Sequence, residues 1–225
     1  MRYTTLYFDL DNTLLDFYAA EAGAIARLLR LYGIDPKNEY ITLYSSINRK
    51  YWEMFERGEI KREEIFTGRF GEFTRRIGAK VDVVKMSGDY FGLLAEGHDV
   101  MPGAQEILEY VRGKGYTVCA TTNGVSKTQH KRILESGLKD YFDFVFISED
   151  TGYQKPQKEY FDYVIANTPE KDRANILIIG DSFTSDISGG INAGIDTCWL
   201  NPKKSKSAIA PTYEIRDISE LKSIL

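Results

Sequence analysis

The sequence predicts an α/β fold in which a doubly wound parallel sheet forms the core and a helical segment interrupts it after the first strand. From Pro102 onward, short apolar runs alternate with segments of helical period, which is the pattern of parallel βαβ units with helices on both faces of a sheet. Before that point the only convincing strand is Leu6–Phe8, and it must join the same sheet because a lone strand is unstable.

The segment after this first strand has the pattern of helices. The apolar face of its first helix follows the spacing i, i+3, i+4, i+7, with members Ile25, Leu28, Leu29 and Tyr32. Apolar residues keep the helical period over 44–55 and again over 65–77, and no convincing strand lies between Phe17 and Asp99. We therefore expect residues 17–99 to form a helical cap, or lid.

The catalytic core is then expected to comprise residues 1–16 and 100–225, with linkers to the cap near 16–22 and 95–101. Within the second part of the core, strands are expected at 116–121, 144–147, 176–179 and 195–200, with a weak strand and helix after Thr212. Helices are expected after Pro102, after Ser126, over 158–166 and over 185–193. Ser126 and Gln129 have the spacing of a capping box, which predicts the start of the second of these helices.

Composition narrows the function. The chain has 225 residues, 43% of them apolar, and a net charge of −4, so it has no bulk attraction for a nucleic acid polymer or an anionic membrane. No segment approaches the roughly 20 apolar residues that span a bilayer, and the N-terminus does not resemble a signal peptide. Cys119 and Cys198 lie in apolar runs, as free thiols in a reducing cytoplasm would. We expect a cytoplasmic monomer or weak homodimer.

Two acids stand at the end of the first predicted strand. Asp9 and Asp11 are two residues apart, so both carboxylates can approach one site at the carboxyl edge of the sheet, where ligands of doubly wound folds bind. The alternative is an ordinary strand-to-turn transition, where Asp is common.

A second acidic cluster follows another strand. Asp181 comes directly after the apolar run 176–179, and Asp186 lies five residues further on. A helix N-cap is the alternative interpretation. Acids gathered at one place repel each other unless a cation lies among them, and oxygen ligands favour Mg²⁺.

Two further segments carry candidate phosphate ligands. Thr122 and Asn123 end the strand that begins near Tyr116, and a hydroxyl with exposed N–H groups before a helix can hold a phosphate. Lys155 precedes Pro156, which restricts its backbone to extended geometry. The alternatives are a helix cap and a solvated surface lysine.

Together these four segments resemble the haloacid dehalogenase-like (HAD) phosphohydrolase superfamily over essentially the whole chain. The resemblance implies a Rossmann-like core with an α-helical cap, and it implies Mg²⁺ as cofactor. It further implies a nucleophilic role for Asp9, a general acid and base role for Asp11, and phosphate binding by Thr122 and Lys155 with support from Asn123. The metal would be held by the Asp9 carboxylate, the Asp11 backbone carbonyl and Asp181, with Asp186 as an indirect ligand.

A charge count agrees with a bound cation. Four ionised aspartates and Lys155, the only cation assigned to the site, carry −3 and would repel a phosphate dianion. Mg²⁺ reduces this charge to −1, and a protonated Asp11 reduces it to zero.

Several other functions are weighed against this one. A haloacid dehalogenase needs no acid at position 11, because a halide leaves without a proton. A phosphomutase uses the same constellation, and a binding protein on a decayed scaffold would lack one of the key residues. Cysteine-based phosphatases are excluded because no Arg stands six residues after Cys119 or Cys198.

The region from 121 to 156 resembles one subfamily, the noncanonical pyrimidine 5′-nucleotidases. The matching residues are Thr121-Thr122-Asn123-Gly124-Val125, Gln129, Arg132, Ser136-Gly137-Leu138, Tyr141-Phe142-Asp143, Ser148-Glu149 and Gln154-Lys155-Pro156. The resemblance implies hydrolysis of a small phosphate monoester such as UMP, dUMP or dTMP. The alternative is a broad phosphatase for sugar phosphates or phosphoglycolate.

Overall fold

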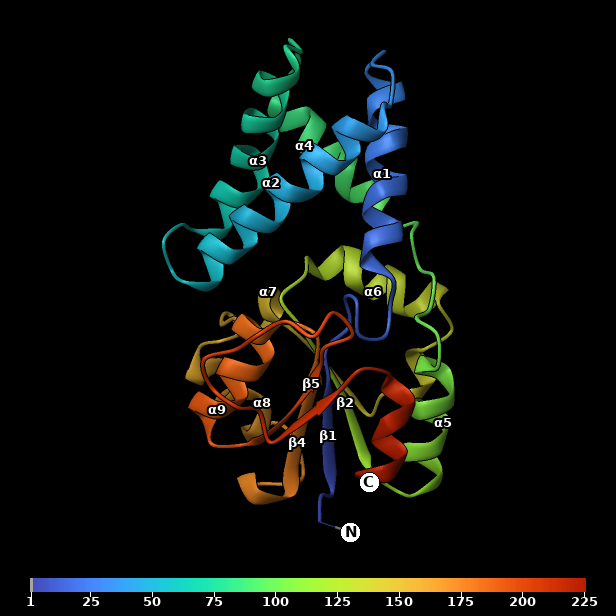
Figure 1. The fold of residues 1–225 in the computed structure, drawn as a ribbon, viewed down its shortest axis with the longest axis vertical. Helices are drawn as coiled ribbons and strands as arrows, with labels where there is room; N and C mark the ends of the chain where they lie inside the picture. The colour runs from blue at the N-terminus through green and yellow to red at the C-terminus, as the bar shows by residue number, and fades with distance from the viewer. Residues whose placement is uncertain (1) are drawn as a thin grey trace. The chain divides into compact units, whose positions relative to one another are not determined.

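The computed structural model describes residues 2–225, which form two compact units (Figure 1). One unit contains residues 2–16 and Asp99–Leu225, and the other contains Phe17–His98. The helical unit thus ends at His98, one residue before the expected end of the cap at Asp99, and Asp99 belongs to the unit that contains the sheet. Each unit is described by itself below.

The first unit is built on a six-stranded parallel sheet, as the sequence predicts. Its strands are β1 (Thr5–Phe8), β2 (Thr117–Thr122), β3 (Phe144–Ile147), β4 (Ile176–Gly180), β5 (Asp196–Leu200) and β6 (Tyr213–Ile215). They lie in the order β3-β2-β1-β4-β5-β6, and every neighbouring pair is parallel. The chain fills one side of β1 before it crosses to the other, so the topological switch point lies at β1.

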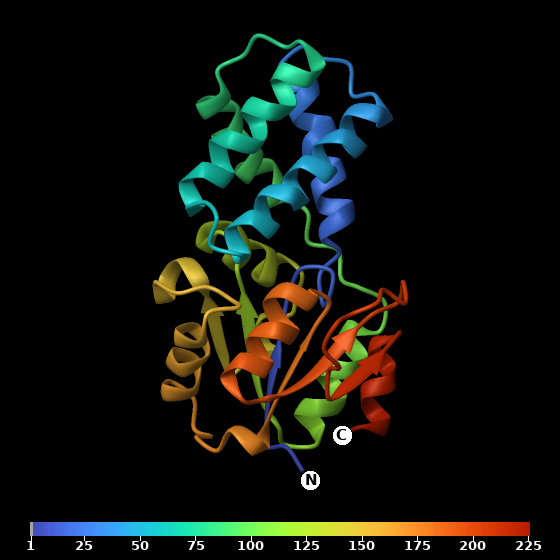
Figure 2. The same ribbon diagram turned by 60° about the vertical axis from the view of Figure 1, so that its left-hand side comes forward.

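Helices cover both faces of this sheet (Figure 2). α5 (Ala104–Gly113) and the 3₁₀ helix η4 (Ile218–Ser223) pack on one face, and α8 (Lys158–Ala166) and α9 (Ser188–Ala193) pack on the other. The remaining elements of this unit are α6 (Ser126–Glu135), α7 (Ser148–Thr151), the 3₁₀ turns η1 (Lys139–Tyr141) and η2 (Arg173–Asn175), and the π-helical turn η3 (Phe183–Ile187).

The burial of β1 explains its apolar sequence. Leu6 and Phe8 point into the core formed with α5, whereas Tyr7 points into the core formed with α8. Successive side chains of a strand face opposite sides of the sheet, so a strand with helices on both faces must be apolar throughout. β4 has the same character, and all five of its residues are buried.

The two cysteines are buried free thiols, as expected. Cys119 lies in β2 and Cys198 in β5, and these strands are separated by β1 and β4, so the two thiols are not neighbours in the sheet. Burial raises the pKa of both thiols, that of Cys198 to about 12. Within residues 2–225, no helix has the length and apolarity needed to cross a bilayer.

The second unit consists of four helices, α1 (Phe17–Leu31), α2 (Asn38–Glu56), α3 (Arg62–Ile77) and α4 (Val83–Leu94). The expected first linker at 16–22 is wrong, because α1 begins at Phe17 and residues 17–22 are already helical. The sequence analysis did not identify α4 as a separate helix, because it found helical periods only in the segments that form the first three helices. The Asp82 carboxylate caps it by accepting a hydrogen bond from the Lys85 backbone N–H at 3.0 Å.

A polar network crosses the interior of this helical unit. The Asn48 side chain donates to Glu21 Oε1 at 2.6 Å and accepts from Arg69 Nη1 at 2.5 Å. All three side chains are buried, and the Arg69 guanidinium also lies over the rings of Phe66, Phe70, Tyr90 and Phe91. One amide therefore joins two buried ionisable groups on α1 and α3.

We predict that Asn48→Leu destabilises the helical unit. The substitution removes one hydrogen bond from each of Glu21 and Arg69, of which Glu21 keeps a contact with Ser45, and each buried polar group that loses its partner costs about 1–3 kcal/mol. We expect a loss of about 2–5 kcal/mol in the free energy of unfolding, measured by urea denaturation. Thr42→Leu, on the exposed face of the same helix, is the control. A similar small effect in both variants would show that the network contributes no stability.

Candidate active site

The carboxyl ends of three adjacent strands bring the predicted residues together. Asp9 follows β1 directly, Thr122 ends β2, and Asp181 follows β4 directly. β1 lies between the other two strands, and all three run in the same direction. The three side chains therefore start from one edge of the sheet at its switch point.

Lys155 lies at the centre of this edge. Its ammonium group donates to Asp9 Oδ1 at 2.7 Å, to Asp186 Oδ1 at 2.6 Å and to the Thr121 carbonyl oxygen at 2.8 Å. Only 1% of the residue is exposed. The two carboxylates raise the pKa of Lys155 above its ordinary value, although burial opposes that rise. The alternative of a solvated surface lysine is therefore wrong.

Asp186 holds Lys155 from the π-helical turn η3. Its Oδ1 accepts from Lys155, and its Oδ2 accepts from the Ser182 backbone N–H at 3.1 Å. A Cβ atom on Gly180 would collide with this carboxylate, so the strand must end in glycine there. Asp186 thus contacts Lys155 and the start of its own turn at once.

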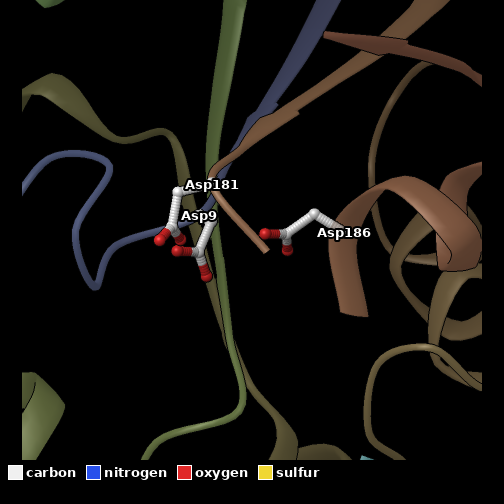
Figure 3. Close-up of side chains that lie close together, drawn as sticks. All are labelled: Asp9, Asp181 and Asp186. Carbon is white, nitrogen blue, oxygen red and sulfur yellow. The ribbon is translucent and has the colours of Figure 1, made fainter. Parts of the chain in front are cut away.

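Asp9, Asp181 and Asp186 form the acidic cluster in Figure 3, and one oxygen of each lies within 4.8 Å of the others. The carboxylates of Asp9 and Asp181 lie side by side, and Asp186 faces them from η3. Burial raises the pKa of Asp9 to about 7, and burial together with the neighbouring acids raises that of Asp181. A hard cation fits this set, because it would satisfy carboxylate oxygens that the protein alone leaves short of positive charge.

The Asp11 side chain turns toward helix α6. Its carboxylate forms an ion pair with Arg132 and accepts from Gln129 Nε2 at 2.9 Å. The Arg132 side chain is fully buried. The assignment of Lys155 as the only cation of the site is therefore wrong, because Arg132 adds a second. The four aspartates and two cations carry −2.

The predicted capping box is also wrong, although the helix begins where expected. The N-cap position of α6 is Val125, and the Ser126 N–H donates to Glu149 Oε2 at 2.6 Å. Gln129 does not reach back to the helix start and instead contacts Asp11 and Thr122. Gln129 and Arg132 are both among the residues that resemble the nucleotidases, but neither was predicted to belong to the site.

Asn123 supports the lysine loop through its amide. Its Nδ2 donates to the Lys155 carbonyl oxygen at 2.8 Å, and its Oδ1 accepts from the Lys155 N–H at 2.9 Å. This pair of hydrogen bonds fixes the backbone from which the Lys155 side chain starts. Thr13 makes a similar link, because its hydroxyl donates to Asp9 Oδ2 at 3.3 Å and accepts from the Asp181 N–H at 3.1 Å.

The fold and the site define an α/β protein with a cluster of buried carboxylates around a lysine at the switch point of a parallel sheet. Residues 3–194 match the family model of haloacid dehalogenase-like hydrolases. The chain belongs to this family. The expected enzyme class, a phosphomonoester hydrolase, is confirmed.

Three relatives match along nearly their whole length. The HAD-hydrolase YfnB of Bacillus subtilis is 44% identical over all of this chain and 96% of its own. The pyrimidine 5′-nucleotidase YjjG of Escherichia coli is 34% identical over all of this chain and 99% of its own. The pyrimidine 5′-nucleotidase PynA of Streptococcus pneumoniae is 36% identical over 98% of this chain and 94% of its own.

Solved structures agree with the fold. A crystal structure of YfnB bound to magnesium superposes with a TM-score of 0.95 at 43% identity and covers all of this chain and 99% of its own. The L-2-haloacid dehalogenase of Xanthobacter autotrophicus has a TM-score of 0.75 at 14% identity, with 99% of this chain and 98% of that chain covered. The second likeness shows a shared fold alone.

We predict that Lys155→Met strongly destabilises the sheet unit. The change leaves Asp9 and Asp186 buried without their counter-charge, and removal of one partner of a buried ion pair costs about 3–5 kcal/mol. Urea denaturation in EDTA, where no added cation can compensate, measures the loss. Lys158→Met, which breaks an exposed ion pair with Asp162, is expected to cost less than about 1 kcal/mol. Equal losses in the two variants would contradict the structural role of Lys155.

Proposed function

We propose that this enzyme hydrolyses pyrimidine nucleoside 5′-monophosphates such as UMP, dUMP and dTMP through an aspartyl phosphate on Asp9, with Mg²⁺ as cofactor. The observation that carries the substrate class is the match of two full-length relatives named pyrimidine 5′-nucleotidase, at 34% and 36% identity. The buried Asp9 beside Lys155 supports the mechanism.

In the first half-reaction an Asp9 oxygen attacks phosphorus, a new P–O bond forms, and the bond to the nucleoside oxygen breaks. Protonated Asp11 gives its proton to that leaving oxygen. In the second half-reaction Asp11 takes a proton from water, the water oxygen attacks phosphorus, and phosphate leaves with Asp9 restored. The Asp11 side chain is 26% exposed, so solvent and substrate can reach it.

Mg²⁺ would be held by the Asp9 carboxylate, the Asp11 backbone carbonyl and Asp181, and Asp186 would act indirectly through its contact with Lys155. When bound, the ion supplies positive charge that draws the phosphate dianion into an acidic site. The bound magnesium in the YfnB crystal structure supports Mg²⁺ as the cofactor. Lys155 and Thr122 would hold the oxygens of the transferred group.

We further propose that the helical unit 17–98 is a cap that supplies contacts to the leaving group. The sheet edge offers a phosphate site that any monoester can use, so discrimination between nucleotides and sugar phosphates must come from elsewhere in the chain.

Two unbridged thiols fit a reducing, cytoplasmic location for the reaction.

A broad phosphatase for sugar phosphates is the competing function. Glyceraldehyde 3-phosphate phosphatases from archaea match at lower identity, such as that of Pyrococcus abyssi at 28% over 87% of this chain. A haloacid dehalogenase is disfavoured by Asp11, because a halide needs no proton to leave.

A substrate panel tests the proposal directly. We expect kcat/KM for UMP, dUMP and dTMP to exceed that for sugar phosphates and phosphoglycolate by at least about tenfold, with activity lost in excess EDTA and restored by Mg²⁺. Released phosphate is measured, and halide release from 2-haloacids serves as the negative control. Equal rates on nucleotides and sugar phosphates would refute the nucleotidase assignment, and full activity in EDTA would refute the metal.

Substitution of the two aspartates tests the mechanism. Asp9→Asn should abolish turnover because the amide is a poor nucleophile. Asp11→Asn should lower kcat by about 10²–10⁴-fold, the usual effect of a general acid or base, while substrate still binds. Asp140→Asn, at an exposed position, is the matched control. Substantial turnover by Asp9→Asn would be incompatible with an aspartyl phosphate.

A further inference from the structure

We propose that Gln129 and Arg132 are positioning residues that fix the direction of the Thr122 hydroxyl, so that it donates its proton to the phosphate oxygen. The inference rests on the proposed function, in which Thr122 holds the transferred phosphoryl group. It concerns a part of helix α6 that the mechanism above does not use.

The first step is the hydrogen bonding of Thr122. Its Oγ1 accepts from the Gly124 backbone N–H at 3.1 Å and from Gln129 Nε2 at 3.0 Å. A hydroxyl has two lone pairs and one proton, so these two contacts use its acceptor capacity. Its proton must therefore point to a third atom, and a phosphate oxygen is an acceptor of that kind.

The second step is the orientation of the Gln129 amide, whose two ends differ in function. Arg132 Nη1 lies 2.9 Å from Gln129 Oε1, and a guanidinium can only donate, so the atom facing it must be the oxygen. The nitrogen end then faces Thr122 and Asp11. Arg132 thus excludes the flipped amide, in which an oxygen would accept the Thr122 proton and withdraw it from the ligand.

The third step is the space that the backbone leaves for this amide. A Cβ atom on Gly124 would lie 2.5 Å from Gln129 Cγ and 2.6 Å from its Cδ. The Gln129 side chain is buried, with 2% of the residue exposed, so it has little room to move away. Gly124 therefore contributes both the N–H that binds Thr122 and the space that the glutamine occupies.

The same two side chains also hold Asp11, through the Arg132 ion pair and the Gln129 amide. The phosphate ligand on β2 and the acid–base group after β1 consequently share one support. Disturbance of Gln129 should weaken phosphate binding through Thr122 and lower kcat through Asp11, and a double-mutant cycle separates the first effect from the second.

The experiment measures the affinity for inorganic phosphate by calorimetry, with Mg²⁺ present, for Gln129→Met in three backgrounds. With Thr122 intact we expect affinity to fall about three- to tenfold, the range for one hydrogen bond. Thr122→Ser keeps the hydroxyl and should show the same loss. In Thr122→Val, which has no proton to orient, Gln129→Met should change affinity by less than about twofold.

Gln105→Met, at an exposed glutamine in α5, is the matched control and should have no effect in any background. Should Gln129→Met fail to fold in thermal denaturation, Gly124→Ala replaces it, because it keeps the amide but displaces it. An equal loss in the Thr122 and Thr122→Val backgrounds, or no loss in either, overturns the inference. Because phosphate binding is measured directly, this outcome is distinct from a wild-type enzyme that hydrolyses no nucleotide.

Discussion

The arrangement of the site depends on the hydrogen bonds that the ammonium group of Lys155 donates. This group binds Asp9 after β1, the Thr121 carbonyl of β2 and Asp186 of η3, and so ties three separate segments of the chain to one buried point. A single positive charge faces two carboxylates there, and Asp181 stands beside them. The protein therefore holds more buried negative charge than it neutralises, and burial together with the neighbouring acids raises the pKa of Asp9 and of Asp181. A cation fits an arrangement of this kind, and in the proposed mechanism it is the charge that the phosphate requires.

Much of this geometry could be predicted from the sequence because it follows from topology. Parallel strands end at a common edge, so acids and hydroxyls placed directly after apolar runs must come together, as Asp9, Thr122 and Asp181 do. The prediction needed no knowledge of side-chain direction. The prediction failed where the direction of a side chain decides which partner it has. Ser126 and Gln129 have the spacing of a capping box, but Gln129 reaches Asp11, 118 residues away in the chain, and a buried tertiary partner outweighs the local one.

The same limit applies to buried charges on helices. A local pattern can place an arginine on one face of a helix, but it cannot show which tertiary partner the residue has. Arg132 in α6 and Arg69 in α3 are nevertheless both buried, one paired with Asp11 and the other with Asn48 beneath aromatic rings. In each unit a helix thus carries a buried cation. The partners come from distant elements, and only the folded chain brings them together.

Counting Arg132 changes the electrostatic argument for substrate binding. With Lys155 as the only cation, neutrality required both Mg²⁺ and a protonated Asp11. With two cations the site carries −2, and a divalent ion alone brings it to zero. In the proposed mechanism a protonated Asp11 serves departure of the leaving group, and charge neutrality for entry of the phosphate does not depend on it. The Arg132 guanidinium and the Gln129 amide together fix where the Asp11 carboxylate lies, beside the end of β2. The contact between Asp11 and Arg132 therefore contributes both to the position of a side chain and to the charge balance of the site.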